Sequence, residues 1–204
     1  MRTKFSLLTI ALFLSIFSAQ AQHEETVLGS RSLGFSGIWG GSRHQLTRFG
    51  NTNNYVHGWQ FGLEFGKALL VNFGGYNLHD DILWNNQPSQ RFDMNWRSFG
   101  LGYGFQNFRA VHPMINVDAG RGKVKLAGEG EDRVFVIQPS AGVEINVFRW
   151  FHVGIEGGYR FVTDSDLASI SDEQLSGAYG QVSLKFGFSW GRYRQGNHHH
   201  RDDD

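Results

Sequence analysis

The chain has 204 residues, and its 19 Lys and Arg residues balance 19 Asp and Glu residues, so its formal net charge is zero. This balance leaves no basic footprint for a nucleic-acid partner. The absence of cysteine excludes disulfide frameworks, thiol catalysis and zinc–thiolate sites.

The N-terminus predicts a secretory signal peptide over residues 1–21. Arg2 and Lys4 form a short positive region, Phe5 to Phe17 form an apolar stretch, and Ala19 to Ala21 give a small-x-small cleavage pattern. The apolar stretch is short for a membrane-spanning helix, although an uncleaved anchor is the alternative. Cleavage before Gln22 leaves a periplasmic N-terminal segment, residues 22–31.

Residues 32–190 contain eight segments that alternate apolar and polar residues, a period typical of β-strands with two different faces. The expected strands are 32–42, 54–67, 69–80, 91–105, 111–124, 134–147, 151–163 and 176–190. The connections alternate between long polar segments (43–53, 81–90, 125–133 and 164–175) and short turns. We interpret this rhythm as an all-β, eight-stranded antiparallel up-and-down transmembrane β-barrel with short periplasmic turns and long external loops.

The second expected strand shows the two faces most clearly. One face contains only large apolar or aromatic side chains and one histidine: Tyr55, His57, Trp59, Phe61, Leu63 and Phe65. The other face mixes glycine with Gln60 and Glu64. Since the interior of an eight-stranded barrel is only wide enough for side chains, the small and polar face is expected inside and the aromatic face toward lipid.

Two strands depart from simple alternation. In 91–105 the apolar residues change phase after Trp96, which predicts a β-bulge near Arg97 and Ser98. Pro139 lacks a backbone N–H inside a closed sheet, so a bulge or irregular pairing is expected there.

Aromatic residues gather near both expected strand ends, as in the two girdles of membrane barrels. The periplasmic set contains Phe65, Phe105, Phe108, Trp150, Phe151, Phe188 and Trp190. The external set contains Trp39, Tyr55, Trp59, Phe92, Trp96 and Phe161.

The signal peptide, the eight amphipathic strands and the aromatic last strand together resemble the small outer-membrane β-barrel family. This family includes the OmpA transmembrane domain and OmpX, and PorT-type barrels of Gram-negative secretion systems are similar. The resemblance implies localisation in the outer membrane of a Gram-negative bacterium and contact with the barrel insertion machinery. Phe186, Phe188 and Trp190 fit an internal insertion signal, followed by a polar His- and Asp-rich tail, residues 191–204.

Seven charged residues are expected on the lumenal face: Glu64, Arg97, Asp118, Glu144, Glu156, Arg160 and Lys185. Buried ions need partners, so they predict a salt-bridge network in the lumen, with Lys185 paired to Glu156 and sharing Glu64 or Glu144. A structural plug is the favoured interpretation, and a gate of exchanging ion pairs is the alternative.

The remaining candidate sites predict little chemistry. His198 to His200 and Asp202 to Asp204 contain metal-ligand types, but nothing fixes their geometry, so we expect a solvated tail. No serine is tied by spacing to a histidine and an acid, so no catalytic residue, metal or cofactor is predicted. Gly37 and Trp39 resemble the Gly-x-Trp start of soluble lipocalins, a third alternative.

The sequence therefore predicts an integral outer-membrane barrel with a structural, adhesive or accessory role. Its expected contacts are outer-membrane lipid or lipopolysaccharide, and an envelope or host protein at the external loops. The alternative functions are a small channel or a secretion or assembly factor, and a lipid-modifying enzyme is a weaker hypothesis. The residues expected in the loops are Arg43, His44, Arg48, Trp84, Gln87, Glu129, Glu131, Asp132, Asp164, Asp166 and Asp172.

Overall fold

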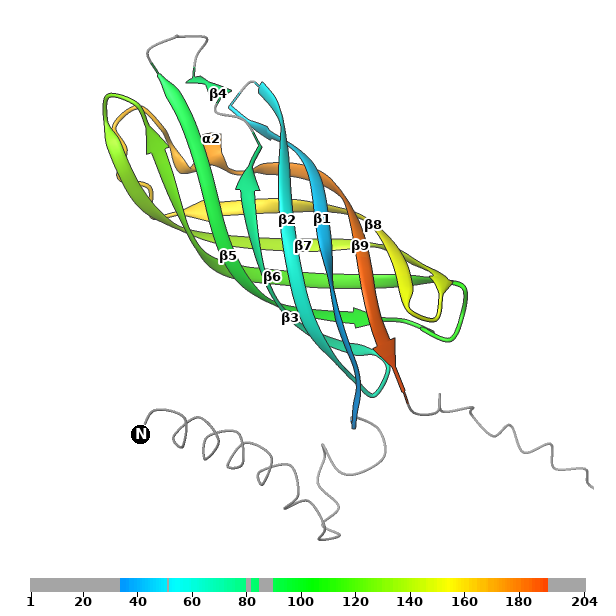
Figure 1. Ribbon diagram of the computed structural model, residues 1–204. Coiled ribbons are helices and arrows are strands. Elements are labelled where there is room, and N and C mark those ends of the chain that lie inside the picture. The colour runs from blue at the N-terminus through cyan, green and yellow to red at the C-terminus, as the bar shows by residue number, and fades with distance from the viewer. Residues whose placement is uncertain (1–33, 51, 80–81, 85–89, 191–204) are drawn as a thin grey trace, which may run out of the picture. The chain divides into compact units, whose positions relative to one another are not determined.

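The computed structural model describes residues 34–50, 52–79, 82–84 and 90–190 (Figure 1). The predicted signal peptide, the segment 22–31 and the tail 191–204 lie outside the described residues. None of the helices in the described ranges is long and apolar enough to cross a membrane.

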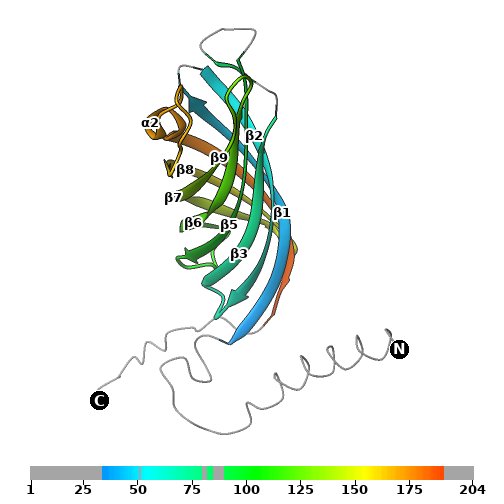
Figure 2. The ribbon, with the colours of Figure 1, turned by 90° about the vertical axis from the view of Figure 1, so that its left-hand side faces the viewer.

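Eight long antiparallel strands form one closed sheet (Figures 1 and 2). They are β1 (Phe35–Phe49), β2 (Thr52–Phe65), β3 (Leu69–Leu78), β5 (Arg91–Gly104), β6 (Val111–Leu126), β7 (Gly130–Phe148), β8 (Phe151–Thr163) and β9 (Gly177–Ser189). Each pairs with its sequence neighbours, β1 pairs with β9, and β3 pairs with β5. The predicted eight-stranded all-β barrel is confirmed.

Two short elements lie at one end of the barrel, near β5 and β8. Strand β4 (Ile82–Leu83) adds to the end of β5, and helix α2 (Asp172–Leu175) lies between β8 and β9. We call this end, where the β3–β5 and β8–β9 connections lie, the loop end. The opposite end, with the β2–β3, β5–β6 and β7–β8 turns, is the turn end, and β1 begins and β9 finishes there (Figure 1).

The β2–β3 turn has the backbone that a tight hairpin needs. Gly66 and Lys67 both have positive φ, 57° and 58°, and the N–H of Ala68 donates to the carbonyl of Phe65 at 3.2 Å. Two consecutive residues in this region match the twist of the flanking strands.

The expected loops 43–53 and 125–133 are wrong for most of their length. Strand β1 continues to Phe49, β2 begins at Thr52, and β6 and β7 are joined only through residues 127–129. Arg43, His44 and Arg48 therefore lie in β1, because alternation continues through these polar residues. Trp84, Glu129, Asp164, Asp166 and Asp172 lie in connections or in α2, Glu131 and Asp132 lie in β7, and Gln87 lies outside the described residues.

The β-bulge expected in β5 is also wrong. The β5–β6 register runs without a shift from the Phe92–Leu126 pair to the Gly104–Met114 pair. Phe92, Met94 and Trp96 thus point inward and are buried, while Phe99, Leu101 and Tyr103 point outward. Trp39 is buried inside as well, so Trp39, Phe92 and Trp96 do not belong to the external aromatic girdle that the sequence predicted.

The ladder near Pro139 is interrupted, as expected, but it does not shift. Strand β7 pairs with β8 at Ile137–Phe161 and resumes in the same register at Ser140–Gly158. The shift in this ladder comes later, between Asn146 and Phe148.

The wall has two zones with opposite polarity. Toward the turn end, exposed apolar side chains such as Phe99, Val117, Ile155 and Phe186 cover the outside, and polar side chains fill the inside. Toward the loop end, the inside is an apolar core. That core contains Phe49, Val56, Tyr76, Leu78, Trp84, Phe92, Met94, Trp96, Val124, Leu126, Val134, Val136, Val162, Ile170 and Leu175.

Candidate functional site in the barrel lumen

Arg43 is the centre of the polar lumen, where it is buried and contacts partners from three other strands. Its Nε donates to Gln60 Oε1 at 2.6 Å, and its Nη1 donates to Asp118 Oδ2 at 2.8 Å. It also donates to the hydroxyl of Tyr76 and, at 3.3 Å, to Asn72 Oδ1. The strands β1, β2, β3 and β6 are thereby connected through one guanidinium.

Glycine makes room for this hub. A Cβ atom on Gly100 of β5 would collide with the side chains of Asp118 and Asn72. The glycines on the inward face thus allow long polar side chains to cross a narrow lumen.

Glu156 belongs to a separate cluster, in which all of its hydrogen-bond partners are neutral side chains. Asn116 Nδ2 donates to Glu156 Oε2 at 2.6 Å, and Ser140 Oγ donates to the same oxygen at 2.8 Å. Gln181 Nε2 donates to the other carboxylate oxygen at 3.4 Å. Lys185 does not contact Glu156, so the expected Glu156–Lys185 pair is wrong.

Lys185 pairs instead with Glu144, nearer the turn end. Lys185 Nζ donates to Glu144 Oε2 at 2.5 Å. His152 Nδ1 lies 3.1 Å from Glu144 Oε1, and His112 Nε2 lies 3.6 Å from the same oxygen. Lys185 lies opposite His152 in the β8–β9 register, four residues from Glu156 along β8, which explains the different partner.

The other predicted lumenal charges are spread along the barrel. Glu64 accepts hydrogen bonds from Ser36 Oγ at 2.9 Å and Ser189 Oγ at 2.8 Å at the turn end. Arg160 is completely buried at the boundary with the apolar core, where it donates to the carbonyls of Leu175 and Arg48 and to Thr47. Its guanidinium carbon lies 3.9 Å from the ring centroid of Phe49.

Arg97 is not lumenal. Its side chain is exposed on the outside of β5, because the unshifted register places odd-numbered residues of this strand outward. The sequence reasoning also missed Arg43, Gln60 and Asn72 as network members. The signal for Arg43 was present, since Arg43, Gln45, Thr47 and Phe49 continue the alternation of β1.

A cavity of about 720 Å³ opens at the turn end of the lumen. Its lining includes Glu64, Glu144, His112, His152 and Arg149. Toward the loop end the cavity gives way to the Arg43 hub and then to the apolar core. The lumen is therefore a vestibule at one end and filled by side chains at the other.

One serine–histidine pair lies on the outer wall. Ser42 Oγ is 3.1 Å from His44 Nε2, and His44 Nδ1 is 2.5 Å from the hydroxyl of Tyr55. A tyrosine stands where a catalytic triad has a carboxylate. Backbone N–H groups in the middle of a paired strand are engaged in the ladder, so this pair has no evident donors for an oxyanion.

No protein-family model and no curated protein matches the sequence. Neisserial surface protein A is a similar solved structure, with a TM-score of 0.53 at 12% identity over 76% of this chain and 97% of that one. Ail of Yersinia pestis (TM-score 0.48, 18% identity) covers 77% of this chain and 99% of its own. OprG of Pseudomonas aeruginosa (TM-score 0.46, 8% identity) covers 78% and 98%.

The likeness to Neisserial surface protein A concerns the fold alone, a closed eight-stranded antiparallel β-barrel. The finer resemblance to OmpA, OmpX or PorT-type barrels stays a prediction.

Proposed function

We propose that this protein is an integral outer-membrane β-barrel with a filled, non-conducting lumen, and that it acts through the surface at its loop end. The observation that carries the proposal is the band of exposed apolar side chains around a polar lumen. Ionic and amide groups inside and Phe, Val and Ile outside make sense only if the surrounding medium is apolar over that band.

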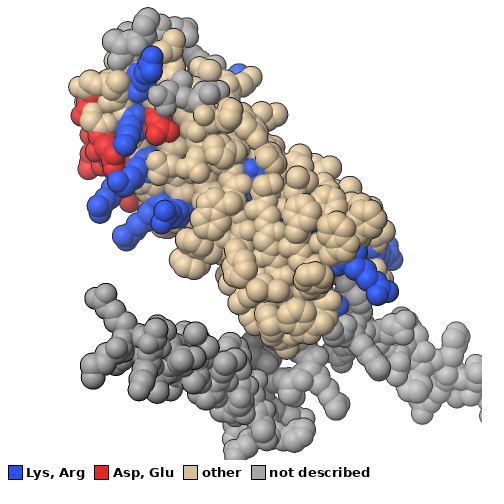
Figure 3. All heavy atoms as spheres, in the orientation of Figure 1, with Lys and Arg blue, Asp and Glu red and all other residues tan. Residues whose placement is uncertain are grey.

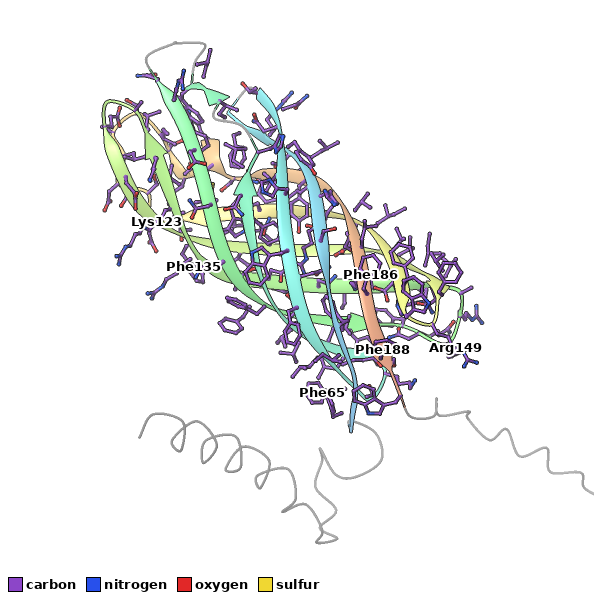
Figure 4. All side chains as sticks on the ribbon, in the orientation of Figure 1. Phe65, Lys123, Phe135, Arg149, Phe186 and Phe188 are labelled. Atoms are coloured by element: carbon purple, nitrogen blue, oxygen red, sulfur yellow. The ribbon has the colours of Figure 1, made fainter. Side chains whose placement is uncertain are left out.

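Aromatic side chains at the turn end support the same membrane placement. Phe148 and Trp150 stack at 5.4 Å between centroids, and Trp150, Phe151 and Phe186 form a continuous cluster. Figure 4 shows Phe65, Phe186 and Phe188 toward this end. Aromatic girdles of this kind lie at membrane interfaces.

Heat modifiability and fractionation test the placement. The folded protein should remain with outer membranes after a carbonate wash and should migrate differently on a gel before and after boiling, because a closed barrel has no frayed edge. Recovery as a soluble periplasmic protein without a mobility shift would reject the membrane assignment and favour the lipocalin-like alternative.

The filled lumen supports a structural rather than a channel role. The Arg43 hub and the apolar core behind it leave the cavity at the turn end without a continuation in the described residues. Purified protein in planar bilayers should show no discrete conductance steps. Reproducible single-channel openings of the native protein would instead favour the channel alternative.

We further propose that the barrel is not an enzyme, because the Ser42–His44–Tyr55 arrangement has neither an acid nor oxyanion donors. A serine-reactive fluorophosphonate should leave Ser42 unlabelled in the folded, bilayer-embedded protein. Stoichiometric labelling that disappears in the His44→Ala variant would overturn this part of the proposal.

The contacts of the loop end are proposed to involve outer-membrane lipid and an envelope or host protein, and the last strand is proposed to contact the insertion machinery. Crosslinking in native outer membranes, followed by identification of captured partners, tests the protein contacts. Capture only of the insertion machinery would argue against a stable protein partner.

A further inference from the structure

Five cations form a continuous basic patch on the outside of β5, β6 and β7. We call Arg97, Arg121, Lys123, Lys125 and Arg133 the basic wall. All five side chains are exposed. Figure 3 shows blue side chains gathered along this side of the loop end, with red ones beside them.

The wall begins where the apolar band ends. On the outer face of β5, Arg97 is the next residue after Phe99 in the direction of the loop end. Between β6 and β7, Arg121 lies opposite the outward Phe135. Figure 4 shows Lys123 and Phe135 on the same side of the barrel, pointing away from it. The cations therefore adjoin the edge of the surface that we propose to face lipid.

The register places like charges next to each other. Arg97 is directly opposite Arg121, and Lys123 is directly opposite Arg133. Such cross-strand partners have Cβ atoms about 4.5–5.5 Å apart, and like charges in this arrangement are destabilising. A bound anion would remove this repulsion.

The anions already present, Glu131 and Asp93, neutralise only part of the wall, and Asp93 lies directly opposite Lys125 in the β5–β6 register. Glu131 Oε1 is 2.5 Å from Lys123 Nζ, and Glu131 Oε2 is 3.1 Å from Lys125 Nζ. Hydrogen bonds from Lys123 and Lys125 lower the pKa of Glu131, so this carboxylate stays ionised at neutral pH. Among the described residues, Arg97, Arg121 and Arg133 have no salt bridge.

We propose that the basic wall binds the phosphate groups of phosphorylated glycolipid headgroups in the outer leaflet. The proposal rests on the outer-membrane placement above and adds a ligand class and the residues that hold it. Guanidinium groups suit phosphate because their planar N–H donors match its oxygens two at a time.

The position of the acids favours a lipid over a soluble polyanion. Glu129 and Asp132 lie at the β6–β7 hairpin and accept hydrogen bonds from Ser169 and Asp166 of the β8–β9 connection, which carries further acids. This acidic tip repels a polyanion that approaches from solution. A headgroup reaches the wall from the side, along the membrane plane.

The test uses protein folded in zwitterionic nanodiscs, with folding checked by the heat-dependent gel shift. The probe is bisphosphorylated lipid A, and binding is measured by native mass spectrometry at several lipid concentrations. The wall variant is Arg121→Gln/Arg133→Gln. The matched control, Arg109→Gln/Arg149→Gln, removes two cations from the turn end, where Figure 4 labels Arg149.

The wall variant should bind lipid A about 10- to 30-fold more weakly than the native protein, since each cation near an anionic surface contributes on the order of a three- to fivefold factor. The control should bind like the native protein. Glu131→Gln should bind more tightly, because it frees Lys123 and Lys125. With dephosphorylated lipid A, the native protein and the wall variant should bind equally weakly.

Equal binding by the wall variant and the native protein, or equal binding of dephosphorylated lipid A, would overturn the proposal. Tighter binding of a soluble polysulfate than of lipid A would also overturn it and identify a polysaccharide surface instead. A protein that fails to insert into the nanodisc contradicts the outer-membrane placement, which is a separate and distinguishable failure.

Discussion

The two zones of the barrel wall solve the same packing problem in opposite ways. Toward the turn end, Arg43, Asp118 and Glu156 fill the inside while Val117 and Ile155 cover the outside. Toward the loop end, Trp96 and Val124 fill the inside while Lys123 and Arg133 cover the outside. The backbone is continuous through both zones, so under the proposed membrane placement the surrounding medium, lipid or water, determines which face is apolar.

Strand β6 shows the reversal within one element. Its outward residues are Ile115, Val117 and Ala119, and then Arg121, Lys123 and Lys125. Its inward residues change from Asn116 and Asp118 to Val124 and Leu126, with Gly120 and Gly122 between them. A phase change of the apolar pattern in an unshifted strand thus marks the edge of the surface that we propose to face lipid.

The largest expected loss of stability comes from replacing the buried arginines of the lumen, Arg43 in the polar part and Arg160 at the boundary with the apolar core. Arg43→Met leaves Asp118 buried without its cation and should lower the free energy of unfolding by about 3–5 kcal/mol. Arg160→Met leaves only neutral acceptors, namely the Leu175 and Arg48 carbonyls and Thr47, and should cost about 1–3 kcal/mol. Denaturant unfolding of both variants in the same lipid vesicles measures the difference. A larger loss for Arg160→Met would contradict the assignment of Arg43 as the hub.

A new cation on the outside should cost much more in the apolar band than on the basic side. Ile155→Arg places a charge against lipid and should cost about 2–4 kcal/mol. Asn95→Arg adds one to a water-exposed surface directly opposite Lys123, where like-charge repulsion should cost up to about 1 kcal/mol. Equal costs, measured by reversible unfolding in vesicles, would remove the distinction between the zones.

A smaller effect concerns the specific partner of Lys185. Lys185→Met should destabilise the barrel, and adding Glu144→Gln should restore part of the loss, with a coupling of about 1–3 kcal/mol. Adding Glu156→Gln instead should give additive losses, because Glu156 contacts only Asn116, Ser140 and Gln181. The double-mutant cycle with Glu156 is the control, and coupling there rather than with Glu144 would reject the pairing.

The sequence was sufficient for the fold because period-two alternation and strand number follow directly from the residues. It failed at the bulge in β5 because a change of apolar phase has two causes, an extra residue or a change of solvent, and the residues alone do not separate them. It failed for the Glu156–Lys185 pair because the heights of the two residues in the barrel were estimated by counting from the ends of their strands, which does not fix the register between the strands. The β8–β9 register, which places Gln181 opposite Glu156, depends on how the whole sheet closes.

Single-cysteine labelling along the outside of β6 tests the reversal of polarity most directly, since the chain has no native cysteine. Each of the six outward positions from Ile115 to Lys125 is replaced in turn, and the folded protein in bilayers is exposed to a lipid-soluble and a water-soluble thiol reagent. Positions 115, 117 and 119 should react only with the lipid-soluble reagent, and positions 121, 123 and 125 with the water-soluble one. Equal labelling at all six positions, or a change at any place other than between Ala119 and Arg121, would contradict the two-zone account.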